Sequence, residues 1–183
     1  IISPVGKQGG RELEVGFIAS VLSRKYTVHV ISLSNYYKDS QVLHFVGFHY
    51  TSVNRLLFKE RRLYRTIANL LAVFSSERKR SSALSSPKLK QFLPIEKRKL
   101  EILKREIDSC TIVLFCTQLS TNYINHLIPY ASRKGKRVFF RTTGTIFEND
   151  WLSKVSWLDD VSKYIHHSLS NANTLQKYTT GPF

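Results

Sequence analysis

The sequence predicts an α/β fold in which helices cover both faces of a doubly wound, Rossmann-like parallel sheet. Short apolar segments alternate with helical ones, a glycine-rich turn follows the first segment, and residues 111–116 are continuously apolar. Such a run is typical of a central parallel strand, because helices bury both of its faces. Alternating strands and helices give parallel strands joined by right-handed crossovers.

The N-terminal part predicts three strands that are short, apolar and rich in β-branched residues. They lie at 1–2, 26–33 and 42–50. The glycine-rich turn at 3–12 and a mostly buried helix at 13–22 connect the first two strands. We expect His49 and Tyr50 to end the third.

Residues 54–74 change to a helical period and predict one basic amphipathic helix. Its apolar stripe consists of Leu56, Leu63, Ile67, Leu70, Leu71 and Phe74. Its opposite side carries Arg55, Lys59, Arg62, Thr66 and Asn69. A charged, serine-rich loop is expected at 77–87, and Pro94 is expected to open a helix that runs to Asp108.

The C-terminal half continues the alternation, with strands at 111–116, 137–140 and 163–167. Helices are expected around 123–128 and at 169–177. Pro129 is expected to kink or restart the first of these helices, and Gly135 to end it. Short helical or irregular structure is expected at 151–161.

Length and composition suit a single domain over residues 1–183, because 183 residues of which 42% are hydrophobic can bury a full core. The sequence shows no signal-peptide pattern and no apolar run long enough to span a membrane. It contains no Met and starts at Ile1, so we expect a trimmed domain. Cys110 and Cys116 are too far apart on one predicted strand to bridge, which fits the reducing cytoplasm.

The turns at the carboxyl ends of the strands are expected to line a ligand cleft, as they do in doubly wound sheets. The glycine-rich turn fits neither standard nucleotide motif, but its lack of Cβ atoms and the helix N-terminus suit a phosphate. The residues expected at that anion are Gly9, Gly10, Arg11 and Glu12. The residues expected to line the cleft are Arg141, Thr142, Thr143, Gly144, His167 and Ser168.

The order of these pieces resembles the N-terminal half of family 4 glycosyltransferases, which are retaining enzymes of the two-domain GT-B fold. Residues 9–12 resemble that family's Gly-Gly-x-Glu turn, and 26–31 its x-H-x-V strand. Residues 164–171 resemble a strand that ends in Ser before a helix, and 180–183 the start of the interdomain linker.

The resemblance implies the acceptor-binding domain of an enzyme that moves a sugar from a nucleotide diphosphate sugar to a saccharide or lipid-linked acceptor. Residues 9–12 would then face the donor's diphosphate or sugar. The donor-binding domain, with most nucleotide contacts and the catalytic residues, would lie outside this sequence. Beyond the nucleotide sugar substrate, no cofactor or metal is expected. His166 and His167 should point to opposite faces of a strand, which disfavours a shared metal ion.

One position departs from the family pattern, because Arg141 stands where many members have a His in the cleft. Its guanidinium could hold a phosphate or carboxylate with two hydrogen bonds. It could equally form a structural salt bridge at the strand end. An arginine cannot act as a neutral general base, so the histidine's role does not transfer.

The formal charge is +15, and residues 54–105 carry +11 of it through fifteen Lys or Arg and four Glu. This basic helical insertion is either a solvated face, an amphipathic surface on an anionic membrane, or a binding site for an anionic polymer. The membrane interpretation fits lipid-linked acceptors at the inner face of the membrane, with Leu57, Phe58 and Tyr64 inserted. The residues expected to bind the anionic surface are Arg55, Lys59, Arg62 and Arg65.

Two other functions remain open. One is a basic α/β domain that binds nucleic acid or another anionic polymer, although no nucleic-acid motif is present and no nucleic-acid partner is expected. The other is a sugar-nucleotide epimerase of the same architecture, for which the cleft offers few carboxylates: Glu12, Glu148 and Asp150.

Overall fold

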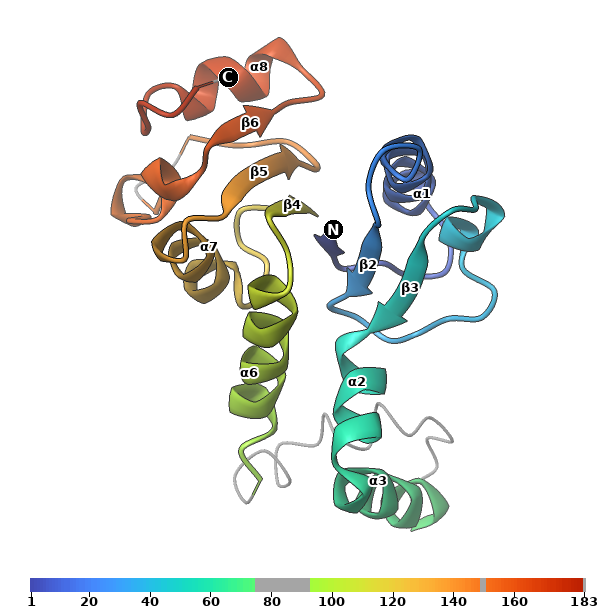
Figure 1. The fold of residues 1–183 in the computed structure, drawn as a ribbon. Helices are drawn as coiled ribbons and strands as arrows, with labels where there is room; N and C mark the ends of the chain where they lie inside the picture. The colour runs from blue at the N-terminus through green and yellow to red at the C-terminus, as the bar shows by residue number, and fades with distance from the viewer. Residues whose placement is uncertain (75–92, 149–150, 183) are drawn as a thin grey trace.

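The computed structural model describes residues 1–74, 93–148 and 151–182 (Figure 1). Its strands form one six-stranded sheet of order β3-β2-β1-β4-β5-β6, and every neighbouring pair is parallel. The strands are β1 (Ile2–Ser3), β2 (His29–Ser32), β3 (His49–Ser52), β4 (Ile112–Thr117), β5 (Arg137–Thr142) and β6 (Lys163–Ile165). The predicted α/β fold with a doubly wound parallel sheet is confirmed.

α-Helices connect β1 to β2, β3 to β4 and β4 to β5, whereas the described parts of the β2–β3 and β5–β6 connections contain only short 3₁₀ helices. The α-helices are α1 (Gly10–Leu22), α2 (Val53–Glu60), α3 (Arg62–Phe74), α6 (Ile95–Asp108), α7 (Ile124–Arg133) and α8 (Leu169–Leu175). The 3₁₀ helices are η1 (Gln41–His44), η2 (Leu152–Lys154) and η3 (Leu158–Asp160). Among the described residues, none of these helices has the length and apolar character needed to cross a membrane.

The sheet separates two apolar clusters, and β4 contributes alternate side chains to each. Val113 and Phe115 join the cluster that contains Leu103 of α6 and Leu127 of α7. Leu114 and Cys116 join the cluster that contains Val15 and Ala19 of α1. This alternation follows from the period of two in a β-strand, and it explains why the entire run at 112–117 is apolar or small.

The third strand was predicted wrongly at 42–50. Residues 41–44 form η1, and β3 begins only at His49. Ser40 caps η1, and Gly47 has a φ of 96°, which an extended strand does not accommodate. Val42 is apolar because it packs under α1. His49 therefore opens β3, and Ser52 ends it.

The single helix predicted at 54–74 is two helices, because the backbone leaves the helical region at Arg61 (φ −127°, ψ 90°). The break changes the buried face, so Leu63 is 66% exposed and Tyr64 is buried. Leu57, Tyr64 and Ala68 pack against Ile102 of α6 in a third cluster. Leu57 and Tyr64 are thus core residues, and the prediction that they insert into a membrane is wrong.

The remaining boundaries differ from the predicted ones by a few residues: β2 begins at His29 and not at residue 26, and α1 begins at Gly10 and not at residue 13. The helix α7 runs through Pro129, its sixth residue, without a break in the assigned helix, at the loss of the hydrogen bond that a proline cannot donate. Gly135 follows the end of α7 with a φ of 66°, as predicted. Strand β5 extends to Thr142, strand β6 ends before His166, and α8 ends at Leu175. The loop predicted at 77–87 lies outside the described residues.

Candidate functional site

The first candidate feature is the glycine-rich turn, which connects the carboxyl end of β1 to α1. Gly9 is the N-cap of α1 with a φ of 143°, a conformation that favours glycine. Its N–H donates to Gln41 Oε1 at 2.8 Å. The Ser40 hydroxyl donates to the carbonyl of Gly6 at 2.7 Å. The N-cap and the first residue of η1 therefore hold the turn in place.

Glu12 closes the inner side of this turn. Its side chain is buried, and Oε1 accepts a hydrogen bond from the Gly6 N–H at 2.6 Å. A Cβ at Gly9 would lie 2.8 Å from Glu12 Oε2, and the φ of 143° is one that other residues rarely adopt, so this position favours glycine. Arg11 donates from Nη1 to the carbonyl of Pro4 at 3.3 Å. The open position is Gly10, where a Cβ would meet nothing within 4 Å.

Arg141 is engaged by Glu14, a residue that the sequence did not single out. Its Nε donates to Glu14 Oε1 at 2.8 Å, and Nη2 forms an ion pair with the same carboxylate. Nη1 also approaches the Ile165 carbonyl at 3.5 Å. The structural salt bridge that the sequence left open is therefore the observed arrangement.

Thr142 lies between the two histidines that follow β6. Its hydroxyl is 2.9 Å from His166 Nδ1, and its carbonyl is 3.4 Å from His167 Nδ1. Burial, together with Arg141 and His167, lowers the pKa of His166. Both imidazoles thus approach one residue, although no group of three His, Cys, Asp or Glu in the described part of the chain is placed to hold a metal ion.

Ser168 and Gly144 have structural roles at this end of the sheet. The Ser168 hydroxyl caps α8 by accepting from the Asn171 N–H at 3.3 Å. Asn171, which the sequence did not flag, is buried and joins α8 to the loop after β5. Its Nδ2 donates to the Gly144 carbonyl at 2.7 Å, and its Oδ1 accepts from the Ile146 N–H at 2.9 Å.

A pocket of about 230 Å³ lies at the carboxyl ends of β4 and β5. Its described lining contains two of the predicted cleft residues, Thr142 and Thr143, with no ionisable side chain. The lining residues are Gln118, Leu119, Ser120, Thr142, Thr143, Thr145, Ile146, Phe147, Trp151 and Leu152. Trp151 also lines an adjoining hollow of about 700 Å³ at the start of α7. The sequence could not assign Trp151 to a ligand site, because only folding brings it beside the ends of the strands.

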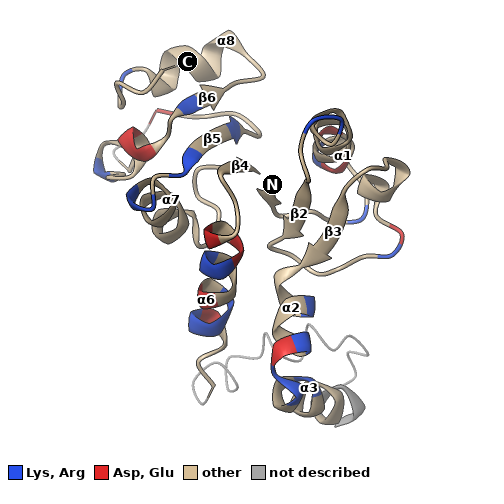
Figure 2. Cartoon of the chain, viewed as in Figure 1, with Lys and Arg blue, Asp and Glu red and all other residues tan. Residues whose placement is uncertain are grey.

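A third pocket, of about 660 Å³, lies between β3 and α2. Three of the four residues predicted to bind an anionic surface line it: Arg55, Lys59 and Arg65. Basic residues are concentrated on α2, the start of α3 and α6, and acidic residues accompany them mainly on α6 (Figure 2). The structure therefore brings Arg55, Lys59 and Arg65 together but leaves Arg62 outside this pocket.

Comparison with known proteins found no matching family model, no matching curated protein and no matching solved structure.

Proposed function

We propose that this chain is the acceptor-side domain of a glycosyltransferase. The enzyme would move a sugar from a nucleotide diphosphate sugar to a saccharide or lipid-linked acceptor, in the synthesis of a cell-surface polysaccharide or glycolipid. The observation that carries the proposal is the uncharged pocket at the carboxyl ends of β4 and β5. Doubly wound domains bind their ligands at this end of the sheet.

The lining of this pocket suits a neutral saccharide. A sugar ring presents hydroxyl groups at its rim and C–H groups on its faces, so it needs both hydrogen-bonding and apolar partners. Threonine, serine and glutamine side chains supply the first, and Phe147 and Trp151 supply flat apolar surfaces. Both aromatic residues are accessible, being 73% and 45% exposed.

The glycine-rich turn would serve the donor side of the same reaction. As the bond between the sugar and the diphosphate breaks, negative charge grows on the departing diphosphate. The N–H groups at the start of α1 favour such charge, and Gly10 leaves space for it to approach. Glu12 already accepts the hydrogen bond from the Gly6 N–H on the inner side of the turn. An anion would therefore be confined to the side of Gly10.

The transfer reaction is the decisive test, and it requires the native polypeptide that contains this sequence. We expect nucleoside diphosphate release and a mass increase of one sugar on the acceptor, both dependent on the acceptor. Isomerisation of the nucleotide sugar without acceptor would instead support the epimerase. Absence of both reactions across a panel of donors would argue against sugar-nucleotide chemistry.

Saccharide binding can be tested separately through tryptophan fluorescence, because the chain has only two Trp. Trp157 is 3% exposed, whereas Trp151 lines the pocket. Neutral oligosaccharides should change the tryptophan emission of the wild type and leave the emission of Trp151→Phe unchanged. The matched control is Trp157→Phe, which retains the reporting Trp151. An equal response in Trp151→Phe and the wild type would contradict the assignment.

A further inference from the structure

We propose that the pocket between β3 and α2 binds a phosphate group, carried by a lipid headgroup or by a soluble phosphate ester. This basic pocket is lined by His49, Tyr50, Thr51, Arg55, Leu56, Phe58, Lys59 and Arg65. The inference is independent of sugar transfer. It assigns a discrete binding site to part of the basic surface, in place of attraction by diffuse positive charge.

The first argument is that no described carboxylate neutralises the cations of the basic pocket. Among the described residues, no Asp or Glu lines the basic pocket. Nor does Arg55, Lys59 or Arg65 form an ion pair within the described ranges. Three cations that converge on a hollow without a carboxylate favour an anionic ligand, because bringing like charges together costs free energy unless a counter-charge is bound.

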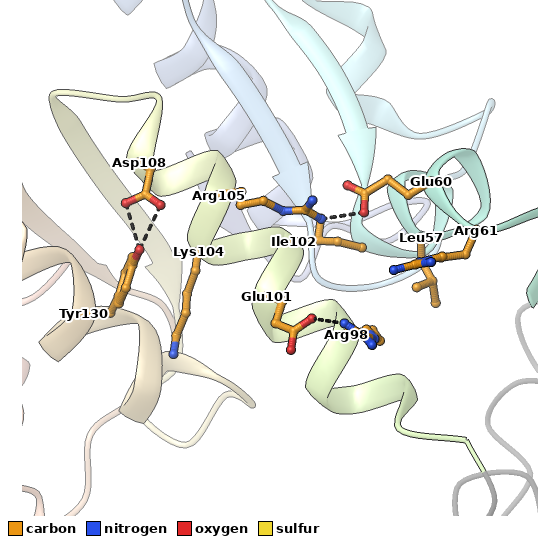
Figure 3. Close-up of a pocket in the computed structure, with 10 residues that line it drawn as sticks. All are labelled: Leu57, Glu60, Arg61, Arg98, Glu101, Ile102, Lys104, Arg105, Asp108 and Tyr130. Carbon is orange, nitrogen blue, oxygen red and sulfur yellow. Dashed lines mark hydrogen bonds and ion pairs between the residues drawn. The ribbon is translucent and has the colours of Figure 1, made fainter.

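A pocket on the other side of α2 provides the contrast. It lies between α2 and α6, has a volume of about 340 Å³ and also contains arginines. There, however, Arg105 pairs with Glu60 at 2.5 Å and Arg98 pairs with Glu101 at 2.7 Å (Figure 3). Arg105 thus joins α6 to α2, and Arg98 pairs within α6, so each of these two arginines has a carboxylate partner in the chain itself. Among the described residues, no carboxylate lines the basic pocket.

The second argument is that Arg55 is held in place before any ligand binds. Its guanidinium carbon lies 4.6 Å from the centre of the Tyr36 ring. Tyr36 in turn stacks on Tyr50, with ring centres 5.1 Å apart and planes 26° apart. The side-chain amide of Asn54 donates to Asn35 Oδ1 at 2.8 Å. This hydrogen bond joins the loop after β2, which carries Tyr36, to α2. A cation positioned in advance loses less conformational entropy when it binds a phosphate.

The third argument is the convergence of the cations from two helices. Arg55 and Lys59 are four residues apart on α2, so they share one face. Arg65 belongs to α3, and it reaches the same pocket because the chain changes direction at Arg61. Arg and Lys donors from different directions are the usual way in which proteins bind phosphate oxygens. Leu56 and Phe58 add apolar surface for the group that carries the phosphate.

The test compares a pocket variant with a charge-matched control. The pocket variant is Arg55→Gln, Lys59→Gln and Arg65→Gln, and the control is Arg24→Gln, Lys25→Gln and Arg137→Gln. All six side chains are exposed, so both variants should fold, which circular dichroism checks. Binding is measured to phosphatidylcholine vesicles that contain phosphatidic acid, and to vesicles of equal surface charge that contain oleate.

We expect the wild type and the control to prefer the phosphatidic acid vesicles, and the pocket variant to lose binding by on the order of a hundredfold. Inorganic diphosphate and glycerol phosphate are titrated calorimetrically without vesicles. Their binding to the wild type, lost in the pocket variant, would identify a soluble ester as sufficient. Binding to vesicles alone would identify the lipid headgroup as the source.

Three results would overturn the inference. Equal losses in the pocket variant and the control would show that diffuse charge attracts the membrane. Equal binding to oleate and phosphatidic acid vesicles would show that the phosphate is not recognised. Tighter binding of a single-stranded oligonucleotide, with a steep fall as salt increases, would assign the pocket to nucleic acid.

Discussion

Arg141 Nε donates a hydrogen bond to Glu14 Oε1 over 2.8 Å, which joins the end of β5 to the first turns of α1. The two side chains are 14% and 30% exposed, so solvent screens the pair only partly. They are 127 residues apart in the sequence. The pair therefore connects the two halves of the sheet at the end where ligands of this fold bind.

We expect this pair to stabilise the fold measurably. Glu14→Gln and Arg141→Gln should each lower the free energy of unfolding, because each leaves the other partner's charge partly buried without its counterpart. A double-mutant cycle by urea denaturation should give a coupling energy of about 1 kcal/mol. Strictly additive effects of the two substitutions would show that the ion pair contributes nothing to stability.

The two cysteines should differ sharply in reactivity. Cys116 is fully buried, and burial raises the pKa of its thiol to about 12. Only the thiolate reacts, so Cys116 should resist iodoacetamide in the folded protein. Cys110 is partly exposed and should be alkylated first. Mass spectrometry of peptides before and after unfolding in urea checks this, with Cys110→Ser as the control that should remain unlabelled when folded.

The stability of the domain should fall in mildly acidic solution because of His166. Its pKa is lowered in the folded state, chiefly by burial and then by Arg141 and His167. Below the ordinary histidine pKa of about 6.5, the unfolded chain therefore binds more protons than the folded one. The contribution of His166 to the free energy of unfolding therefore decreases as the pH falls from 7.5 to 5.5. Urea denaturation at these two pH values should show a smaller difference for His166→Asn than for the wild type, and an equal difference would contradict this.

The sequence predicted the sheet well because each central strand carries its own signal. The run at 112–117 is apolar on both faces, so it indicates a buried strand without any knowledge of its neighbours. β3 carries no such signal, since its four residues are His, Tyr, Thr and Ser. Val42 has the apolar character of a strand residue, but it lies in η1. It is buried because the fold packs it against α1.

The candidate sites were predictable only as positions along the chain. The sequence located Arg141 at a strand end. Its ion pair, however, is formed with Glu14, which lies on a helix far away in the sequence. In the same way, Trp151 and Gln118 share a pocket because β4 and β5 are neighbours in the sheet. The basic pocket combines residues of β3, α2 and α3, and its geometry depends on the break at Arg61.

The corrected face of α2 and α3 makes a prediction about stability. Leu57 is fully buried against α6, so Leu57→Ala should lower the free energy of unfolding by about 2–5 kcal/mol. Leu63 is exposed, and Leu63→Ala should change that free energy by less than about 0.5 kcal/mol. Thermal or urea denaturation distinguishes the two. A larger loss for Leu63→Ala than for Leu57→Ala would instead support the apolar stripe expected from the sequence.

The two neighbouring glycines of the turn should separate folding from function. Gly9→Ala should lower the free energy of unfolding by about 1–3 kcal/mol, because φ is 143° and the new Cβ would lie 2.8 Å from Glu12 Oε2. Gly10→Ala should leave that free energy within about 0.5 kcal/mol of the wild type, because a Cβ there meets nothing within 4 Å. Urea denaturation of both variants measures these effects on the domain.

The open space at Gly10 also makes the larger substitution Gly10→Val a test of donor binding. Its side chain would fill the space through which a diphosphate approaches the start of α1, and urea denaturation checks that the variant still folds. In the native polypeptide we therefore expect Gly10→Val to reduce kcat/KM for the nucleotide sugar by at least about tenfold, which corresponds to one lost interaction with the charged group. Gly10→Ala should cause a smaller loss. Full activity of a folded Gly10→Val would show that no donor phosphate approaches this turn.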